Sequence, residues 1–146
     1  MIGFRVSSRL PLSPSVVWER AITVEGVNYE LGPLVRMTVP EGADLRQGPL
    51  GRSWVLLFGV LPVDYDDLFI EWFEPGVGFR ERSTMGSASA WWHDRSLLPL
   101  PDGSTRVVDH IRFEPRVGLF GGLQAFTFEA MFRWRHRRLR DFFGSR

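Results

Sequence analysis

Residues 91–113 read WWHDRSLLPLPDGSTRVVDHIRF, and this stretch decides the fold. At its centre, Pro101-Asp102-Gly103 is typical of a tight turn. Proline suits the first central position of a type I turn, aspartate tolerates the second, and glycine supplies the left-handed residue that follows. The sequence therefore predicts a β-hairpin with a three-residue loop that pairs Leu100 with Ser104.

This turn fixes which residues face each other across the hairpin. Its register pairs Leu97 with Val107, Arg95 with Asp109, His93 with Ile111 and Trp91 with Phe113. These eight residues share one face. The other face is more polar, so we expect the first face to be interior. A two-residue Asp-Gly turn is the alternative, but it would pair the apolar face of one strand with the polar face of the other.

The predicted interior face contains charged residues. Arg95 and Asp109 oppose each other, and His93 lies one alternation away. The predicted strand 78–84 places Phe79, Glu81 and Ser83 on one side, which would bring Glu81 near His93. A buried charge is costly unless it is paired. These groups therefore form either a closed structural network or the lining of a wet cavity.

Glycine, proline and aspartate divide the remaining sequence into further elements. The predicted strands cover residues 2–10, 52–61, 67–74, 78–84, 89–100 and 105–115, and 34–39 is compatible with another short strand. Two faces compete for the interior of 67–74: Leu68, Ile70 and Trp72, or Phe69, Glu71 and Phe73. Pro40-Glu41-Gly42 reads as a turn.

Two helices are predicted. Ser13-Pro14 is typical of a helix start, and the first helix should run to about Thr23, with Gly26 ending it. The second should run from Leu123 to Phe143, about 30 Å long, with Gly144 as its C-cap. Gly118 and Gly121-Gly122 read as a loop before it. The arginines at 133, 135, 137, 138 and 140 are interpreted as a solvated helix end, and contact with an anionic surface or nucleic acid is the alternative.

Composition limits the classes of function. The 146 residues fit one domain over residues 1–146, and the net charge of +1 does not mark a nucleic-acid binder. The chain has no cysteine and only three well-separated histidines, so we expect neither a disulfide nor a metal site. No signal peptide or transmembrane run is evident. We expect a soluble cytoplasmic monomer or homodimer without membrane insertion.

Several short motifs, in this order, are similar to those of one superfamily. They are Ser13-Pro14-Ser15-Val16-Val17-Trp18, then Glu74-Pro75 with Phe79, then Gly86 with Trp91 and His93, and finally Gly103, Thr105, Asp109 and Phe113. Over essentially its whole length the chain resembles the START and birch-pollen-allergen-like superfamily (SRPBCC), closest to bacterial ligand-binding or polyketide cyclase/dehydrase-like members. At the position of Arg95 close relatives often carry a histidine, at that of Glu81 an aspartate and at that of Ser83 a glutamine. The polar lining of this chain therefore differs from that of those relatives.

The resemblance implies an α+β helix-grip fold. A curved antiparallel sheet of six to seven strands would wrap a long C-terminal helix, with one or two short helices after the first strand. Such a fold encloses a cavity between the sheet and the last helix. We expect a void of a few hundred Å³, at the lower end for ligand pockets.

We therefore expect binding of a small hydrophobic molecule, such as a lipid, polyketide or isoprenoid, without a cofactor or metal. The expected ligand-binding residues are Trp54, Phe58, Phe79, Glu81, Trp91, His93, Arg95, Asp109, Ile111, Phe113, Phe128 and Phe132. The alternation of Trp54, Leu56 and Phe58, and the stripe of Phe128, Phe132 and Leu139, fit a cavity wall and a plain core equally well.

Two other readings remain open. The chain could be a cyclase-, dehydratase- or hydrolase-like enzyme that uses His93 with Asp109 or Glu81 as acid and base. No Ser, Thr or Cys nucleophile can be placed beside His93, which argues against this alternative. The chain could also be an interaction protein whose own aromatic side chains fill the cavity.

Overall fold

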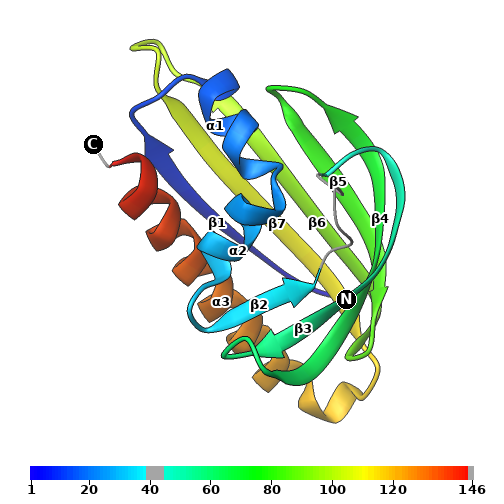
Figure 1. The fold of residues 1–146 in the computed structure, drawn as a ribbon. Coiled ribbons are helices and arrows are strands. Elements are labelled where there is room, and N and C mark those ends of the chain that lie inside the picture. The colour runs from blue at the N-terminus through cyan, green and yellow to red at the C-terminus, as the bar shows by residue number, and fades with distance from the viewer. Residues whose placement is uncertain (39–44, 145–146) are drawn as a thin grey trace.

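A computed structural model of the chain describes residues 1–38 and 45–144. In order, the elements are β1 (Ile2–Leu10), α1 (Pro14–Ala21), α2 (Val24–Leu31), β2 (Val35–Thr38), β3 (Gly48–Leu57), β4 (Leu61–Glu74), β5 (Gly78–Met85), β6 (Ala88–Pro99), β7 (Thr105–Pro115), η1 (Gly118–Phe120) and α3 (Gly121–Phe143). The strands form one antiparallel sheet in the order β1-β7-β6-β5-β4-β3-β2. The sheet is curled, and α3 packs against β1, β7 and α2 (Figure 1). The predicted helix-grip fold is confirmed.

The β6–β7 hairpin has the predicted register. Arg95 pairs with Asp109 and His93 with Ile111, and the backbone N–H of Leu100 donates to the carbonyl of Ser104 at 2.9 Å. Gly103 has a φ of 86°, which a glycine adopts without strain. All eight residues of the predicted interior face are buried. The three-residue loop is therefore confirmed.

Strand β4 resolves the ambiguity of residues 67–74 in an unexpected way. Leu68 and Ile70 face inward, but a register shift between Ile70 and Trp72 reverses the alternation. Trp72 is consequently 43% exposed, and the ring of Phe73 packs 5.0 Å from that of Trp18. Neither of the two simple alternating sets describes the strand.

Strand β3 differs from its prediction over 52–61. It begins at Gly48 and ends at Leu57, with register shifts between Pro49 and Gly51 and between Val55 and Leu56. Trp54 lies on the outer face, where its ring packs against Tyr65. Phe58 lies in the turn after β3 and is 66% exposed. The predicted inward face of Trp54, Leu56 and Phe58 is wrong because bulges shift the alternation.

The glycines of the helical regions were misread. Gly26 does not end α1, which ends at Ala21; it lies in α2, and its backbone N–H donates to the Thr23 side chain at 2.9 Å. A Cβ at Gly26 would lie 2.1 Å from the carbonyl oxygen of Arg20, so a glycine lets α1 and α2 approach closely.

The glycines before the last helix are not a loop. Gly121 and Gly122 form the first turn of α3, and Gly118 begins η1. Gly144 ends α3 as predicted, with a φ of 87°. The predicted turn at 40–42 lies outside the described residues. Over the ranges described, no helix is both long and apolar enough to cross a membrane.

The interior contains two apolar clusters with a polar layer between them. Leu97 and Val107 belong to one cluster, and Trp91 and Ile111 belong to the other. The charged residues of the hairpin occupy the alternating positions between these pairs on β6 and β7. The sheet therefore carries its buried charges as a band across its inner face.

Candidate functional site

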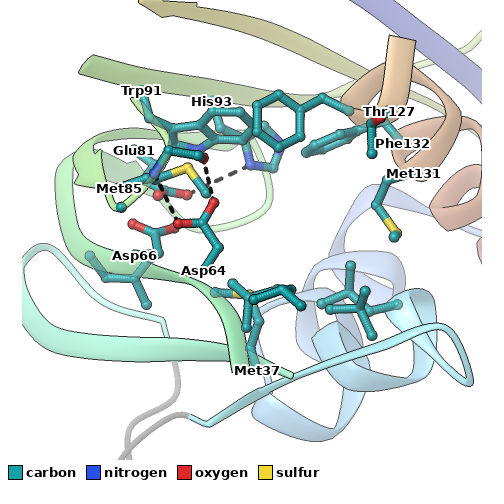
Figure 2. A pocket seen from close by; sticks show the side chains of 18 of the residues that line it. Met37, Asp64, Asp66, Glu81, Met85, Trp91, His93, Thr127, Met131 and Phe132 are labelled. Atoms are coloured by element: carbon teal, nitrogen blue, oxygen red, sulfur yellow. Dashed lines mark hydrogen bonds and ion pairs between the residues drawn. The ribbon is translucent and has the colours of Figure 1, made fainter. Parts of the chain in front are cut away.

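A cavity of about 620 Å³ lies between the inner face of the sheet and α3. Most of its lining is apolar and comes from α2, β2 to β6 and α3, for example Leu31, Met37, Val55, Leu68 and Met131 (Figure 2). Its volume is within the usual range of ligand pockets, about 300–1,000 Å³, and above the lower end that we expected. The aromatic side chains of the interior therefore do not fill it.

Six of the predicted binding residues line this cavity: Phe79, Glu81, Trp91, His93, Phe128 and Phe132. Two pairs of these aromatic rings pack edge to face. The ring centroids are 4.9 Å apart for His93 and Phe132 and 5.0 Å apart for Trp91 and Phe128. These contacts hold the imidazole and the indole as parts of one aromatic wall.

The other predicted binding residues lie elsewhere. Ile111 and Phe113 are buried in the apolar cluster behind the wall. Arg95 and Asp109 are buried beneath His93 and do not line the cavity. Trp54 and Phe58 do not line the cavity either, because the bulged β3 turns them away from it.

One end of the cavity lining reaches the surface. Val117, Phe120 and Leu123 line the cavity, yet each is more than half exposed. They come from η1 and the residues on either side of it. At this end the cavity lining is therefore exposed to solvent.

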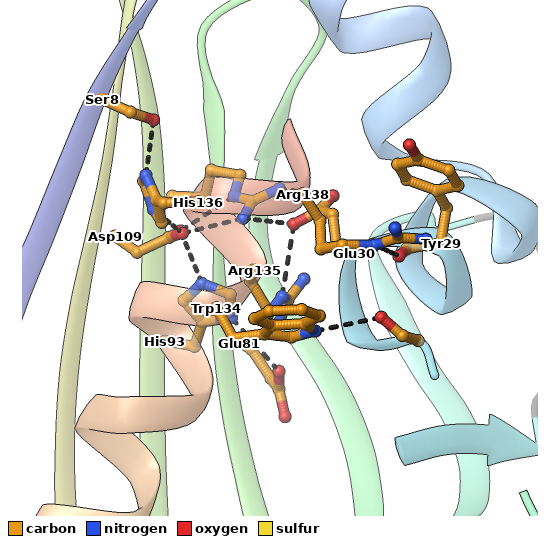
Figure 3. A network of polar contacts seen from close by, with 12 residues as sticks. Ser8, Tyr29, Glu30, Glu81, His93, Asp109, Trp134, Arg135, His136 and Arg138 are labelled. Atoms are coloured by element: carbon orange, nitrogen blue, oxygen red, sulfur yellow. Dashed lines mark hydrogen bonds and ion pairs between the residues drawn. The ribbon is translucent and has the colours of Figure 1, made fainter. Parts of the chain in front are cut away.

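Beneath His93, Asp109 accepts four hydrogen bonds. Its Oδ1 accepts from Nε2 of His93 at 2.7 Å and from Nε of Arg95 at 2.8 Å. Its Oδ2 accepts from Nη2 of Arg95 and Nε2 of His136, both at 2.7 Å. The hydroxyl of Ser8 donates to Nδ1 of His136 at 2.6 Å (Figure 3). Both oxygens of this buried carboxylate are saturated.

Glu30 of α2 completes this arrangement. Its carboxylate accepts from Nη1 and Nη2 of Arg95 at 3.1 and 2.8 Å, and from Nε of Arg135 at 3.2 Å. We call the whole set the Asp109 network; it comprises Ser8, Glu30, His93, Arg95, Asp109, Arg135 and His136. Two carboxylates face two guanidinium groups, so the network is balanced in charge.

The pKa shifts follow from this pairing. Burial opposes ionisation of Asp109, but Arg95 and His93 outweigh it and hold the pKa of Asp109 well below its ordinary value. Glu30 behaves in the same way: burial is outweighed by Arg95 and Arg135, and its pKa is lowered. The network is therefore ionised at neutral pH. Asp109 cannot serve as an acid there.

Sequence reasoning missed four of the seven residues of the Asp109 network: Ser8, Glu30, Arg135 and His136. Arg135 and His136 are 7% and 1% exposed, so the prediction of solvated arginines is wrong for Arg135. Arg138 is also engaged, because its Nε donates to the carbonyl of Tyr29 at 3.0 Å. The sequence did contain a sign that Arg135 and His136 are buried, because positions 135 and 136 lie on the same helical face as Phe132 and Leu139.

A second group of buried charges lies at the polar end of the cavity. Asp66 and Glu81, which we call the acidic pair, line the cavity and are 4% and 6% exposed. Oδ1 of Asp66 and Oε2 of Glu81 have no hydrogen-bond partner among the described residues. Figure 2 shows both carboxyl groups at the same end of the pocket, near Trp91 and His93.

The electrostatics of the acidic pair differ from those of the network. Burial, together with the charge and hydrogen bond of Glu81, raises the pKa of Asp66 well above its ordinary value. Asp66 therefore holds a proton to higher pH than an exposed aspartate. It was missed because the predicted strand began at residue 67, whereas β4 begins at Leu61.

His93 connects the two groups. The carboxylate of Asp109 can only accept, so Nε2 of His93 must carry the proton. In the neutral ring, Nδ1 is then an acceptor, and it lies 3.9 Å from Oε1 of Glu81. This distance is too long for a direct hydrogen bond. The polar end of the cavity thus presents two carboxyl oxygens without a hydrogen-bond partner among the described residues, beside an imidazole nitrogen that can accept.

Comparisons with known proteins agree with the fold. The model of the family described as "Domain of unknown function (DUF8410)" matches residues 8–143. No curated protein matches the chain. Among solved structures, protein CV1439 from Chromobacterium violaceum is 16% identical, with a TM-score of 0.76 over 99% of both chains.

Two further structures resemble the chain. The AHSA1 protein from Silicibacter pomeroyi is 14% identical, with a TM-score of 0.70 over 94% of each chain. Ara h 8.0201 is 12% identical, with a TM-score of 0.63 over 96% of this chain and 98% of the other. At these identities the likeness concerns the fold alone, and it agrees with the helix-grip fold that the motifs implied.

Proposed function

The chain belongs to the DUF8410 family, and we propose that it binds a small, largely apolar molecule in the cavity between the sheet and α3. The observation that carries this proposal is the cavity itself, about 620 Å³ in volume with a mostly apolar lining. We infer that residues 1–146 act as one domain of this kind.

The lining suggests a division of roles. The aromatic wall of Trp91, Phe128 and Phe132 contacts the apolar body of the ligand, while His93 and Glu81 contact its polar group. Arg95 and Asp109 act through His93, whose ring they hold in place, and do not touch the ligand. A lipid, a polyketide or an isoprenoid would meet these requirements.

Catalysis in the same cavity is a second candidate, favoured by one observation. Asp66 retains its proton to unusually high pH and faces the cavity, as a general acid must. Asp109 is unsuited to this role because its oxygens are saturated. If the pair catalyses, purified wild-type protein should carry a converted ligand and the Asp66→Asn protein an unconverted one, which native mass spectrometry would distinguish.

The binding proposal is tested by filling the cavity. Met131 lines it from α3, so Met131→Trp should place an indole inside and weaken binding of N-phenyl-1-naphthylamine, a fluorescent apolar probe, at least tenfold. Ala130→Trp adds the same ring at an exposed position of α3 and should leave the probe affinity unchanged. Native mass spectrometry of freshly purified protein should show a bound small molecule that Met131→Trp lacks. Equal probe binding by both variants would contradict the proposal.

A further inference from the structure

The acidic pair leaves acceptors in the cavity that the protein itself does not satisfy. Oδ1 of Asp66 and Oε2 of Glu81 are buried and lack a hydrogen-bond partner among the described residues. Nδ1 of His93 lies on the same side and is an acceptor in the neutral ring. Buried acceptors without donors are costly, and such groups in a ligand cavity point to a donor supplied from outside.

The arginines around the acidic pair form their ion pairs with other carboxylates. Arg95 is engaged by Asp109 and Glu30, and Arg135 is engaged by Glu30. Within residues 1–38 and 45–144, no ion pair joins an arginine to either carboxyl of the acidic pair. The balanced network therefore leaves the acidic pair without a cation.

The other charged side chains of the lining are also occupied. Nε of Arg116 donates to the carbonyl of Met85 at 3.0 Å. Asp64 accepts hydrogen bonds from the backbone N–H and the hydroxyl of Ser87. Among the described residues that line the cavity, the buried oxygens without a hydrogen-bond partner are thus those of the acidic pair.

We propose that the ligand is an apolar molecule carrying a protonated amine, which Asp66, Glu81 and Nδ1 of His93 hold at the polar end of the cavity. This inference rests on the proposed binding function and specifies its ligand class. A primary ammonium has three donors for these three groups, and its positive charge offsets the burial and the Glu81 charge that disfavour ionisation of Asp66. Trp91 lines the cavity near the acidic pair, and an aromatic ring is a favourable neighbour for a cation.

A hydroxyl is the competing head group, and it fits less well. It has only one hydrogen to donate, so it would leave at least one buried acceptor unsatisfied. It also brings no positive charge to the acidic pair, so the ionisation of Asp66 stays disfavoured. A carboxylate head would add a third negative group and is disfavoured on the same grounds.

The test compares three ligands with the same alkyl chain and different heads. Dodecylamine, dodecanol and dodecanoate, each below its micellar concentration, are titrated against wild-type protein loaded with N-phenyl-1-naphthylamine at pH 7. Dodecylamine should displace the probe at least tenfold more tightly than dodecanol, which is the scale of one charged hydrogen bond. Dodecanoate should bind weakest.

Variants then assign the preference to the acidic pair. Asp66→Asn/Glu81→Gln keeps the shapes of both side chains and should reduce the affinity for dodecylamine at least tenfold while dodecanol still binds. Retained dodecanol binding also shows that the variant is folded. Glu71→Gln removes one charge at an exposed position of β4 and should leave the amine preference unchanged.

The possible failures are distinguishable. If the probe and dodecanol bind but dodecylamine is not preferred, or if the double variant keeps the preference, the amine inference is wrong and the binding function stands. If neither the probe nor any of the three ligands binds, the proposed function fails and the inference fails with it.

Discussion

The Asp109 network and the acidic pair are two groups of buried ionisable residues on the inner face of one sheet, and Glu81 of the pair lies directly opposite His93 of the network across β5 and β6. In the network, both oxygens of Asp109 are saturated and two carboxylates face two guanidinium groups. In the acidic pair, two carboxyls lie together and an oxygen of each lacks a hydrogen-bond partner among the described residues. The network is complete without a ligand, and the acidic pair is not.

The comparison shows that buried carboxyl groups can stabilise the fold in one place and leave hydrogen-bonding capacity for a ligand in another. Paired charges hold β6, β7, α2 and α3 together at the centre of the interior. Unpaired charges beside a cavity cost stability, and a ligand can offset that cost. Opposite pKa shifts express this contrast: the pKa of Asp109 is lowered and that of Asp66 is raised.

The largest expected effect comes from breaking the network. Asp109→Ala leaves Arg95 buried without one of its two carboxylate partners, and should cost about 3–5 kcal/mol of unfolding free energy in a urea titration. A double-mutant cycle with Arg95→Ala should show strong coupling, because the two side chains share two hydrogen bonds.

A matched pair on the outer face provides the control. Asp94 also accepts a hydrogen bond from an arginine across the sheet, Arg80, at 2.8 Å, but on the outer face, where Arg80 is exposed and Asp94 is partly buried. Asp94→Ala should therefore cost no more than about 1 kcal/mol. If both aspartate variants lose the same stability, the network does not hold the fold together in the way described here.

How far the sequence predicted this contrast depends on the range of the interactions. The Arg95–Asp109 pair was predictable because a local turn fixes its register, and period-two patterning chose the inner face. Glu30 and His136 were not, because they reach the pair from helices distant in sequence. Trp54 and Phe58 were misplaced because bulges break the alternation on which the prediction depended.

A smaller effect, of opposite sign, is expected at the acidic pair. The raised pKa of Asp66 means that the folded protein ionises it less readily than the unfolded chain does. Wild-type stability should therefore fall as pH rises above about 4, the ordinary pKa, until the folded pKa is passed. Asp66→Asn removes this loss. Its stability advantage should grow by about 1.4 kcal/mol for each pH unit in that window.

Neighbouring Asp67 gives the contrasting control in the same urea titrations. Its hydrogen bond with Arg52 lowers its pKa, and it lies on the outer face. Asp67→Asn should therefore gain no advantage as pH rises. An Asp66→Asn protein whose relative stability is independent of pH between 4 and 8 would show that the acidic pair is not strained in the absence of a ligand.

The smallest expected effect is at His93, where the network and the acidic pair meet. Nε2 of His93 donates to Asp109, and its other nitrogen faces Glu81 in the cavity. His93→Gln keeps a polar head of similar reach, so the affinity for a bound apolar ligand should stay within about tenfold, or 1.4 kcal/mol. If His93 were instead a general acid or base, the same change would remove about 10²- to 10⁴-fold of rate and leave affinity nearly intact.

Displacement of N-phenyl-1-naphthylamine measures the affinity, and mass spectrometry of the ligand before and after incubation measures its rate of conversion. Turnover by wild-type protein that disappears in His93→Gln, with binding unchanged, would replace the binding function with an enzymatic one.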